Sequence, residues 1–305
     1  MSKPLQIAAT RTPSGQTAIA DVRAAFREAR PVVQLVFAMR FAVGGTLSLS
    51  STTFSPLHAV AGQTAWLAAV WFVYLVNGVS DVAGDRLNSS SRPIARGLLG
   101  LERANVISVV LCAFSILVGG VVGLEFSLLC ASMLVLGVIY SHGPYALKRW
   151  SPSASLTVGA AGFASYVAGA FAYNGAVSSS TVLVAGVMGA WMAAGGNYKD
   201  LGDEVGDRSA GRRTLPVLLG RRRAALLIWA ACLAISLLAL FATFRDPAIW
   251  PVVALVPAAT LLARSWAFKQ SDKEERTAGA KFPYRVFMVS QYTVNGLLLV
   301  TGSLS

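Results

Sequence analysis

Long blocks of hydrophobic residues alternate along the chain with short polar connectors. The blocks are much longer than the short periodic runs of apolar residues in soluble helices. A helix needs about 20 mainly apolar residues to cross the hydrocarbon core, because every backbone polar group must be satisfied within the segment. We therefore predict an all-α, multi-pass integral membrane protein with nine transmembrane helices. The predicted spans lie near residues 31–54, 59–81, 104–123, 125–143, 154–174, 180–199, 223–244, 248–267 and 283–303.

The composition argues against a soluble enzyme. Hydrophobic residues make up 55% of the 305 residues and charged residues only 13%, about half the ~25% share of a soluble domain. The three cysteines, at positions 112, 130 and 232, lie in apolar blocks without metal-ligand spacing, and there are only two histidines. These features exclude a zinc site and a disulfide scaffold. Although the net charge is +12, the basic residues lie between apolar spans, so we predict no nucleic-acid partner.

Lysine and arginine are distributed unevenly among the connectors. Of the 26, 24 lie before the first predicted span or after spans two, four, six and eight. By the positive-inside rule, the N-terminus and these connectors are cytoplasmic and the C-terminus lies on the opposite side. Twelve of the 14 acidic residues share that side, and only Glu125 and Asp246 lie opposite. The polar chemistry is therefore predicted at the cytoplasmic surface.

The chain divides into two predicted parts. Residues 1–30 are expected to be a cytoplasmic tail without chemistry, with an amphipathic surface helix from about Ala18 to Arg30. Residues 31–303 are expected to form one transmembrane domain. Within its first span, Arg40 either faces a cavity or reaches back to the cytoplasmic interface, because an unpaired charge in the membrane is costly. The sequence leaves both orientations open.

Two aspartate motifs follow the second and sixth predicted spans. In the first, Asn77, Asp81 and Asp85 are spaced i, i+4 and i+8, which places them on one face if the helix continues. In the second, the spacing of i, i+3 and i+7 again predicts one shared face. Its aspartates are Asp200, Asp203 and Asp207. Each motif ends in Gly-Asp-Arg before a basic stretch with a proline, and Asp81 and Asp203 are 122 positions apart, which suggests an internal duplication.

If the two halves face each other, five aspartates converge on one cavity. Like carboxylates a few ångströms apart repel each other unless a cation is present. Oxygen ligands without histidine or thiolate suit Mg²⁺, which binds carboxylates together with substrate phosphates. Basic residues in the same connectors would hold the phosphate oxygens. An apolar bundle beneath such a site predicts a substrate with a charged head and a lipid tail, and a prenyl diphosphate fits that description.

The motifs resemble those of the UbiA superfamily of intramembrane prenyltransferases. The first reads N-x-x-x-D-x-x-x-D-R, starting at Asn77 and followed by Arg92-Pro93. The second, KDLGDEVGDRSAGRRTLPVLLG from Lys199, is most similar to the homogentisate and chlorophyll-type branches. The connector after the fourth span, residues 140–149, is similar to the family's Tyr-Ser-x-x-Pro-x-x-x-Lys loop. One departure is Glu204-Val205, where related sequences have the reverse order, so we expect Glu204 at the surface or in the cap.

The resemblance implies a UbiA-like bundle with a cytoplasmic cap, formed by residues 86–103 and 208–222. It also implies that both aspartate motifs bind the diphosphate through Mg²⁺. The implied metal ligands are Asn77, Asp81, Asp85, Asp200, Asp203 and Asp207, and the implied catalytic residues are Asp81, Asp85, Asp203 and Asp207. The candidate substrate-binding residues are Asn77, Arg86, Arg92, Tyr140, Lys148, Arg149, Tyr198, Lys199, Arg208 and Arg212.

The resulting hypothesis is a magnesium-dependent prenyltransferase. Loss of diphosphate would give an allylic cation, captured by an aromatic acceptor such as a phenol or quinone precursor. One alternative keeps the metal site and folds the prenyl cation onto its own double bonds, as in terpene cyclases that resemble this superfamily. A second alternative is a lipid or small-molecule transporter, whose acids should line a path through the membrane, whereas here the far side carries almost no charge.

Overall fold

The structure is a computed structural model that describes residues 17–49, 54–87, 90–267 and 273–302, and this part of the chain contains no β-strand. Residues 1–16 of the predicted N-terminal tail therefore lie outside the described residues. The longer helices are α1 (Ala18–Glu28), α2 (Pro31–Leu47), α3 (Pro56–Leu87), α4 (Leu101–Val122), α5 (Leu124–Ser141), α6 (Ser151–Asn174), α7 (Ser179–Gly195), α10 (Arg221–Arg245) and α13 (Lys273–Gly302). The shorter ones are η1 (Leu147–Arg149), η2 (Gly196–Gly202), α8 (Glu204–Ser209), α9 (Leu215–Leu219), η3 (Pro247–Ala254), α11 (Leu255–Leu262) and α12 (Arg264–Ala267).

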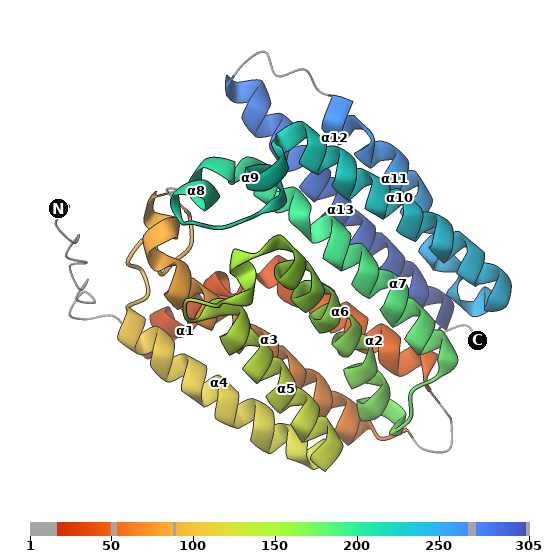
Figure 1. Cartoon of the computed structure of the whole chain (residues 1–305). Coiled ribbons are helices and arrows are strands. Elements are labelled where there is room, and N and C mark those ends of the chain that lie inside the picture. The colour runs from red at the N-terminus through yellow and green to blue at the C-terminus, as the bar shows by residue number, and fades with distance from the viewer. Residues whose placement is uncertain (1–16, 50–53, 88–89, 268–272, 303–305) are drawn as a thin grey trace.

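The long helices lie side by side in one bundle (Figure 1). Helix α3 packs against α4 and α5, α2 packs against α6 and α13, and α7 packs against α6 and α10. Each of the nine predicted apolar segments overlaps a helix or a run of helices. Six helices in the described part are long and apolar enough to cross a membrane, and two shorter apolar stretches are Pro31–Leu47 and Pro247–Leu262. The number of nine spans stays a prediction.

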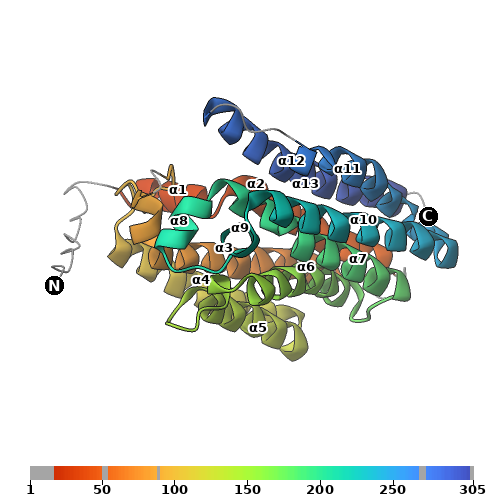
Figure 2. The ribbon, with the colours of Figure 1, turned by 45° about the horizontal axis from the view of Figure 1, so that its top comes forward.

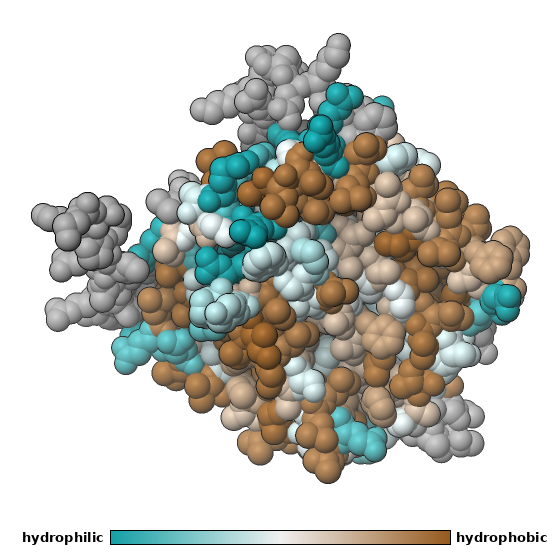
Figure 3. Space-filling model, in the orientation of Figure 1, coloured by the Kyte–Doolittle hydropathy of each residue, from teal (hydrophilic) through white to brown (hydrophobic). Residues whose placement is uncertain are grey.

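The outer surface of the bundle is hydrophobic. In Figure 3, apolar side chains cover most of the visible face, whereas many hydrophilic ones gather at the upper left, over the region of α8 and α9. Large apolar side chains on α4 and α5 point outward, such as Leu117, which is 74% exposed, and Leu128. Contiguous apolar surface of this kind is rare on soluble monomers. The surface identifies an integral membrane protein whose helices face lipid.

Helices α2 and α6 approach each other closely at two glycines. A Cβ atom on Gly169 would lie 1.8 Å from the carbonyl oxygen of Phe41, and one on Gly44 would lie 1.9 Å from the carbonyl oxygen of Tyr166. Membrane helices pack through such small residues because lipid offers no hydrophobic driving force for their association. This contact fixes α2 beside α6 and so shapes one wall of the central cavity.

Replacing Gly169 with alanine is expected to destabilise the protein. The added methyl group collides with backbone, which cannot swing away, and overpacking of this kind typically costs about 1–3 kcal/mol or more. Gly186→Ala is the matched control, because a Cβ atom there meets nothing within 4 Å and alanine favours the helix. Thermal unfolding in detergent measures both. Equal melting temperatures for the two variants would contradict the close contact.

Helix α1 occupies most of the segment that was predicted to form a surface helix, and it lies against the bundle. The indole Nε1 of Trp71 donates to the carbonyl oxygen of Ala25 at 3.0 Å, and the ring of Phe26 contacts the Trp71 ring edge-on at 5.5 Å. Arg103 of α4 forms an ion pair with Asp21. Figure 2 shows α1 at the same end of the molecule as α8. The N-terminal helix is therefore docked beside the polar end of the bundle.

The second aspartate motif differs from the predicted continuous helix. Helix α7 passes into the 3₁₀ turn η2, and α8 begins only after Asp203. Glycines at positions 195, 196, 202 and 206 lower the helix propensity of this stretch, and 3₁₀ turns are common where a helix ends. The expected i, i+3, i+7 stripe of a regular α-helix is therefore wrong, although its three aspartates still reach one cavity.

Candidate active site

A cavity of about 290 Å³ lies between α2, α3, α5, α6, η2 and α13. Its polar wall comes from the two aspartate motifs and the basic connectors. The rest of the wall is largely apolar and aromatic. The predicted site residues that line it are Asn77, Asp81, Asp85, Arg92, Tyr140, Lys148, Lys199, Asp200, Asp203, Asp207 and Arg212. Two motifs 122 positions apart thus face one space, as the duplication predicted.

Three of the predicted arginines, Arg86, Arg149 and Arg208, lie outside the cavity lining. The Nε of Arg86 donates to the carbonyl oxygen of Ala95 at 3.2 Å. Arg208 is largely exposed, and its Nη2 lies 3.1 Å from Glu204 Oε1, one helical turn earlier. The spacing of the motif placed Arg86 and Arg208 beside aspartates in sequence, but each lies on another face of its helix. Glu204 is partly exposed and is not part of the cavity lining.

Tyr198 and Arg149 also lie outside the cavity lining. Tyr198 is fully buried in the apolar core instead. Near Arg149, two connectors meet: the amide of Arg213 donates to the carbonyl oxygen of Arg149 at 2.8 Å, and the amide of Ser151 donates to that of Arg213 at 3.2 Å. The guanidinium of Arg213 lies 4.7 Å from the centre of the Trp150 ring. The basic stretch after the second motif is thereby tied to the loop after α5.

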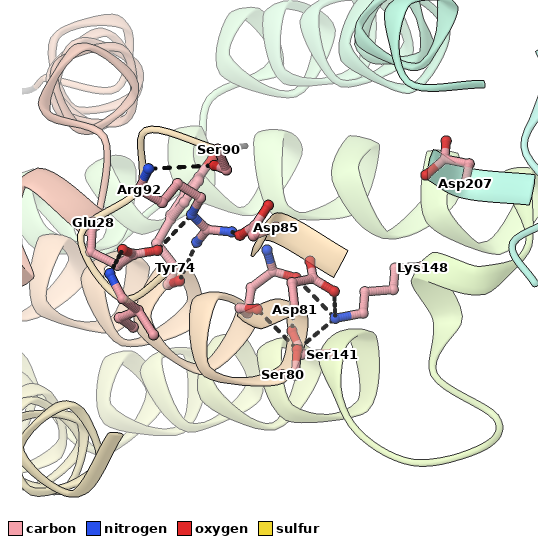
Figure 4. A network of polar contacts seen from close by, with 12 residues as sticks. Glu28, Tyr74, Ser80, Asp81, Asp85, Ser90, Arg92, Ser141, Lys148 and Asp207 are labelled. Atoms are coloured by element: carbon pink, nitrogen blue, oxygen red, sulfur yellow. Dashed lines mark hydrogen bonds and ion pairs between the residues drawn. The ribbon is translucent and has the colours of Figure 1, made fainter. Parts of the chain in front are cut away.

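Lys148 contacts the first motif directly. Because α3 continues to Leu87, Asn77, Ser80 and Asp81 lie on one face of the same helix. Lys148 Nζ lies 2.8 Å from Asp81 Oδ1, 2.5 Å from Ser80 Oγ and 3.3 Å from Asn77 Oδ1 (Figure 4). Burial lowers the pKa of the Lys148 ammonium, while Asp81 opposes that shift. The predicted helix-face stripe of the first motif is confirmed, and a lysine from another connector binds to it.

Arg212 joins the two motifs. Its Nη2 lies 2.6 Å from Asp81 Oδ1, and its Nη1 lies 3.4 Å from Asp207 Oδ1. Burial alone would lower the pKa of Arg212, but the two carboxylates outweigh it and raise that pKa. Asp207 is 4% exposed, and burial raises its pKa. One guanidinium therefore holds together carboxylates from both halves of the bundle.

The third cation of the site, Arg92, is held by the N-terminal helix. Arg92 Nη1 lies 2.9 Å from Asp85 Oδ2, and its Nε lies 2.5 Å from Glu28 Oε1. The amide of Ile94 donates to Glu28 Oε2 at 2.9 Å. Glu28 is 0% exposed, and Figure 4 shows it on the far side of Arg92 from Asp85. A chain of charges thus runs from α1 to the first motif.

Glu28 was not singled out from the sequence, although it contacts an arginine that lines the cavity. The available signal was an acid within a segment whose other charges near it are the arginines at positions 23, 27 and 30. Sequence alone could not reveal its partner, because Arg92 is 64 positions later. The contact depends on how α1 docks against α3.

Replacing Glu28 with alanine is expected to destabilise the protein and reduce turnover. Removing one partner of a buried ion pair typically costs about 3–5 kcal/mol, because the other charge is left uncompensated. Arg27→Ala, an exposed neighbour on the same helix, is the control. Thermal unfolding and prenyl diphosphate turnover measure the two effects. Wild-type stability in the Glu28 variant would show that α1 does not position Arg92.

Asn197 anchors the second motif to the bundle and was not singled out from the sequence. Its Nδ2 donates to the carbonyl oxygen of Ala193 at 2.7 Å, and its Oδ1 accepts from Ser151 Oγ at 3.1 Å. These bonds tie η2 to the start of α6. Lys199 and Asp200, which follow Asn197, thereby line the cavity.

The donor set of the cavity suits a hard divalent cation, since it consists of carboxylate and amide oxygens. Within the described residues, no three acidic, histidine or cysteine side chains lie close enough together to hold one ion. Lys148 and Arg212 are paired with Asp81 instead, and Arg92 with Asp85. The aspartates fit a metal whose remaining ligands are supplied by a phosphate substrate, once these cations turn to that phosphate.

Comparisons with known proteins found a matching family model and similar proteins. The family model of the UbiA prenyltransferase family matches residues 38–290. A digeranylgeranylglyceryl phosphate synthase of Halobacterium salinarum is 30% identical over 194 residues, 62% of this chain and 65% of that protein. A probable homogentisate phytyltransferase 2 of rice is 28% identical over 227 residues, 70% of this chain and 60% of that protein. The chain thus spans less than two thirds of the length of these relatives.

Solved structures show the same fold. A UbiA homologue from Archaeoglobus fulgidus, solved with DMAPP and Mg²⁺, superposes with a TM-score of 0.70 at 20% identity. The superposition covers 90% of this chain and 99% of that one. The structure of the same homologue with GPP and Mg²⁺ gives the same values.

Proposed function

The chain belongs to the UbiA prenyltransferase family, and we propose that it transfers a prenyl group from a prenyl diphosphate to an acceptor within the membrane. The observation that carries the proposal is the meeting of both aspartate motifs on one cavity whose other walls are largely apolar. A diphosphate fits the charged wall, and an isoprenoid chain fits the apolar one.

Mg²⁺ is the proposed cofactor, held by oxygens of Asn77, Asp81 and Asp85 on α3 and of Asp200, Asp203 and Asp207 in the second motif. When bound, it neutralises the negative charge that develops on the departing diphosphate. The A. fulgidus homologue was solved with Mg²⁺ and a prenyl diphosphate, which supports this assignment.

The three cations of the site have a second task in this proposal. Without substrate, Lys148, Arg212 and Arg92 balance the aspartates. When a diphosphate enters, the same cations can donate to its non-bridging oxygens, and charge-assisted bonds of that kind are among the strongest that proteins make. Arg212 contacts both motifs, so it is placed to bind a diphosphate that lies between them.

The apolar part of the cavity has to exclude water from the allylic cation that forms as the diphosphate leaves. Phe37, Tyr74, Tyr284 and Phe287 line it together with aliphatic side chains. Aromatic faces attract cations. They would therefore stabilise positive charge on the prenyl chain without reacting with it.

We propose an acceptor with a nucleophilic ring, such as a phenol or quinone precursor. The support is the similarity to a probable homogentisate phytyltransferase, but a digeranylgeranylglyceryl phosphate synthase is similar to the same degree. The acceptor is therefore tested between these two classes, both of which carry an anionic group.

The charge distribution supports three further proposals about the topology. The N-terminus and the basic connectors lie on the cytoplasmic side. Residues 86–103 and 208–222 form the cap, and the transmembrane domain extends from residue 31 to residue 303.

The first experiment incubates purified protein with Mg²⁺ and geranyl, farnesyl or geranylgeranyl diphosphate, with and without a panel of aromatic acids, phenols and glyceryl phosphates. Diphosphate release and organic products are followed by mass spectrometry. Release that depends on the acceptor and yields a prenylated product supports the transferase. Release without acceptor that yields a cyclic hydrocarbon supports the cyclase instead, and no release under any condition contradicts both.

A further inference from the structure

Arg40 is a buried cation on the wall of the proposed substrate cavity. It lies on α2, is 2% exposed and lines the same cavity as the aspartate motifs. Of the two orientations that the sequence left open, the structure therefore shows the one toward the cavity. The guanidinium lies 5.0 Å from the centre of the Phe37 ring, one turn earlier on the helix.

The contacts of Arg40 satisfy only part of its guanidinium. Its Nη2 donates to Gln291 Oε1 at 2.6 Å. Its Nε and Nη1 are buried and make no well-formed hydrogen bond among the described residues, although the Tyr166 hydroxyl is close enough to interact with the guanidinium. The ion pairs of the described chain do not include Arg40 either. A guanidinium is not deprotonated in a protein, so Arg40 stays charged. Its Nε and Nη1 remain available as hydrogen-bond donors to a ligand.

Buried polar groups on α6 and α13 hold this guanidinium in place. Gln291 and Asn295 lie on successive turns of α13 and are both fully buried. Asn295 Nδ2 donates to the carbonyl oxygen of Gln291 at 2.7 Å, and Tyr166 Oη of α6 donates to Asn295 Oδ1 at 2.7 Å. Three helices thus fix the position of Arg40 before any ligand arrives. Burying a charge in the membrane is costly, and such costly groups usually mark function.

Three of the other cavity cations differ from Arg40. Lys148, Arg92 and Arg212 are each paired with an aspartate of a motif, and so belong to the diphosphate end. Two more cations line the cavity: Lys199 adjoins Asp200 of the second motif, and Arg30 directly precedes α2. Arg40 is the tenth residue of its helix, about 13.5 Å from its start at 1.5 Å per residue, and takes part in no ion pair of the described residues. It therefore offers a separate place for a negative group within the same cavity.

We propose that Arg40 binds the anionic group of the acceptor, a carboxylate or a phosphate monoester. This inference rests on the proposed function, because it assigns the second substrate of the same cavity. Anchoring the acceptor by its acid places the remainder of the molecule between Arg40 and the diphosphate end. The donors Nε and Nη1 supply charge-assisted hydrogen bonds, and the neutral analogue of the same acceptor forfeits them.

The test compares each acid with its neutral analogue by direct binding to full-length protein in detergent, without prenyl diphosphate. The pairs are 4-hydroxybenzoate and 4-hydroxybenzamide, homogentisate and its amide, and geranylgeranylglyceryl phosphate and geranylgeranylglycerol. The first two pairs test a carboxylate and the third a phosphate. At least one acid is expected to bind wild type at least tenfold more tightly than its analogue. If no acid is preferred, or none binds, the proposal is overturned.

Variants of Arg40 separate the effect of its charge on acceptor binding from its effect on the stability of the protein. Arg40→Gln should lose the preference for the acid, and Arg40→Lys should retain part of it. Ser290→Ala is the matched control, because it removes a buried hydroxyl next to Gln291 that accepts from Trp191 and lies outside the cavity lining, and it should keep the preference even if it lowers the melting temperature. Retained preference in folded Arg40→Gln overturns the proposal. Should that variant fail to fold, the wild-type pairs still decide.

Binding and turnover fail independently. Acid preference through Arg40 in a protein that releases no diphosphate would contradict the proposed function and leave the anionic subsite standing. Acceptor-dependent transfer in a protein that binds acid and amide equally would support the proposed function and contradict the anionic subsite at Arg40.

Discussion

Asp81→Ala is expected to lower turnover by at least about a thousandfold while the protein still folds. Asp81 is the carboxylate at which the halves of the site meet, since Lys148 and Arg212 both contact its Oδ1. Losing one preorganised group that stabilises developing charge typically costs about 10²–10³ in rate, and Asp81 additionally positions two cations. Asp203→Ala should behave alike, because Asp203 lines the same wall from the second motif.

The measurement is diphosphate release under saturating prenyl diphosphate and acceptor, with melting temperature recorded in parallel. Glu125→Gln is the control, because Glu125 is exposed near the start of α5 and does not line the cavity. It should retain the wild-type rate. Wild-type turnover in either aspartate variant would refute the proposed role of the motifs.

Removing divalent metal is expected to abolish turnover completely and reversibly. The cavity lining holds five aspartates and six lysines or arginines, so the side-chain charges nearly cancel and leave little positive charge for a diphosphate. Treatment with a chelator should therefore reduce diphosphate release to background. Added Mg²⁺ should restore it, whereas NaCl at the same ionic strength should not. Full activity in metal-free buffer would exclude the proposed chemistry.

The sequence predicted most of the fold because its strongest signal, uninterrupted apolar length, is also the main physical constraint on a membrane helix. It also predicted the first motif well, since α3 continues as a regular helix through Asn77, Asp81 and Asp85. It failed at the second motif, where glycines shorten the helix and the chain tightens into η2. The predicted spacing of the aspartates assumes a regular α-helix, and the low helix propensity of the glycines makes that assumption fail at the second motif.

The sequence missed the residues that act through distant partners. Glu28 is tied to the site only because α1 docks beside α3, and no pattern in either segment encodes that contact. Arg86 and Arg208 were included because they follow aspartates directly, yet neighbours in sequence point to different faces of a helix. The orientation of Arg40 could not be predicted because it depends on the position of α13, which lies near the other end of the sequence.

The pairing of α2 with α13 also constrains how this protein is made. Arg40 and Gln291 are 251 positions apart, and at about 5–20 residues per second a ribosome needs roughly 12–50 seconds to pass from one to the other. During that interval the first hydrophobic helix carries a charge whose partner has not been synthesised. The bundle can close around Arg40 only when the last helix enters the membrane. Loss of α13 through a premature stop codon would therefore remove the hydrogen-bond partner of Arg40 as well as the last helix.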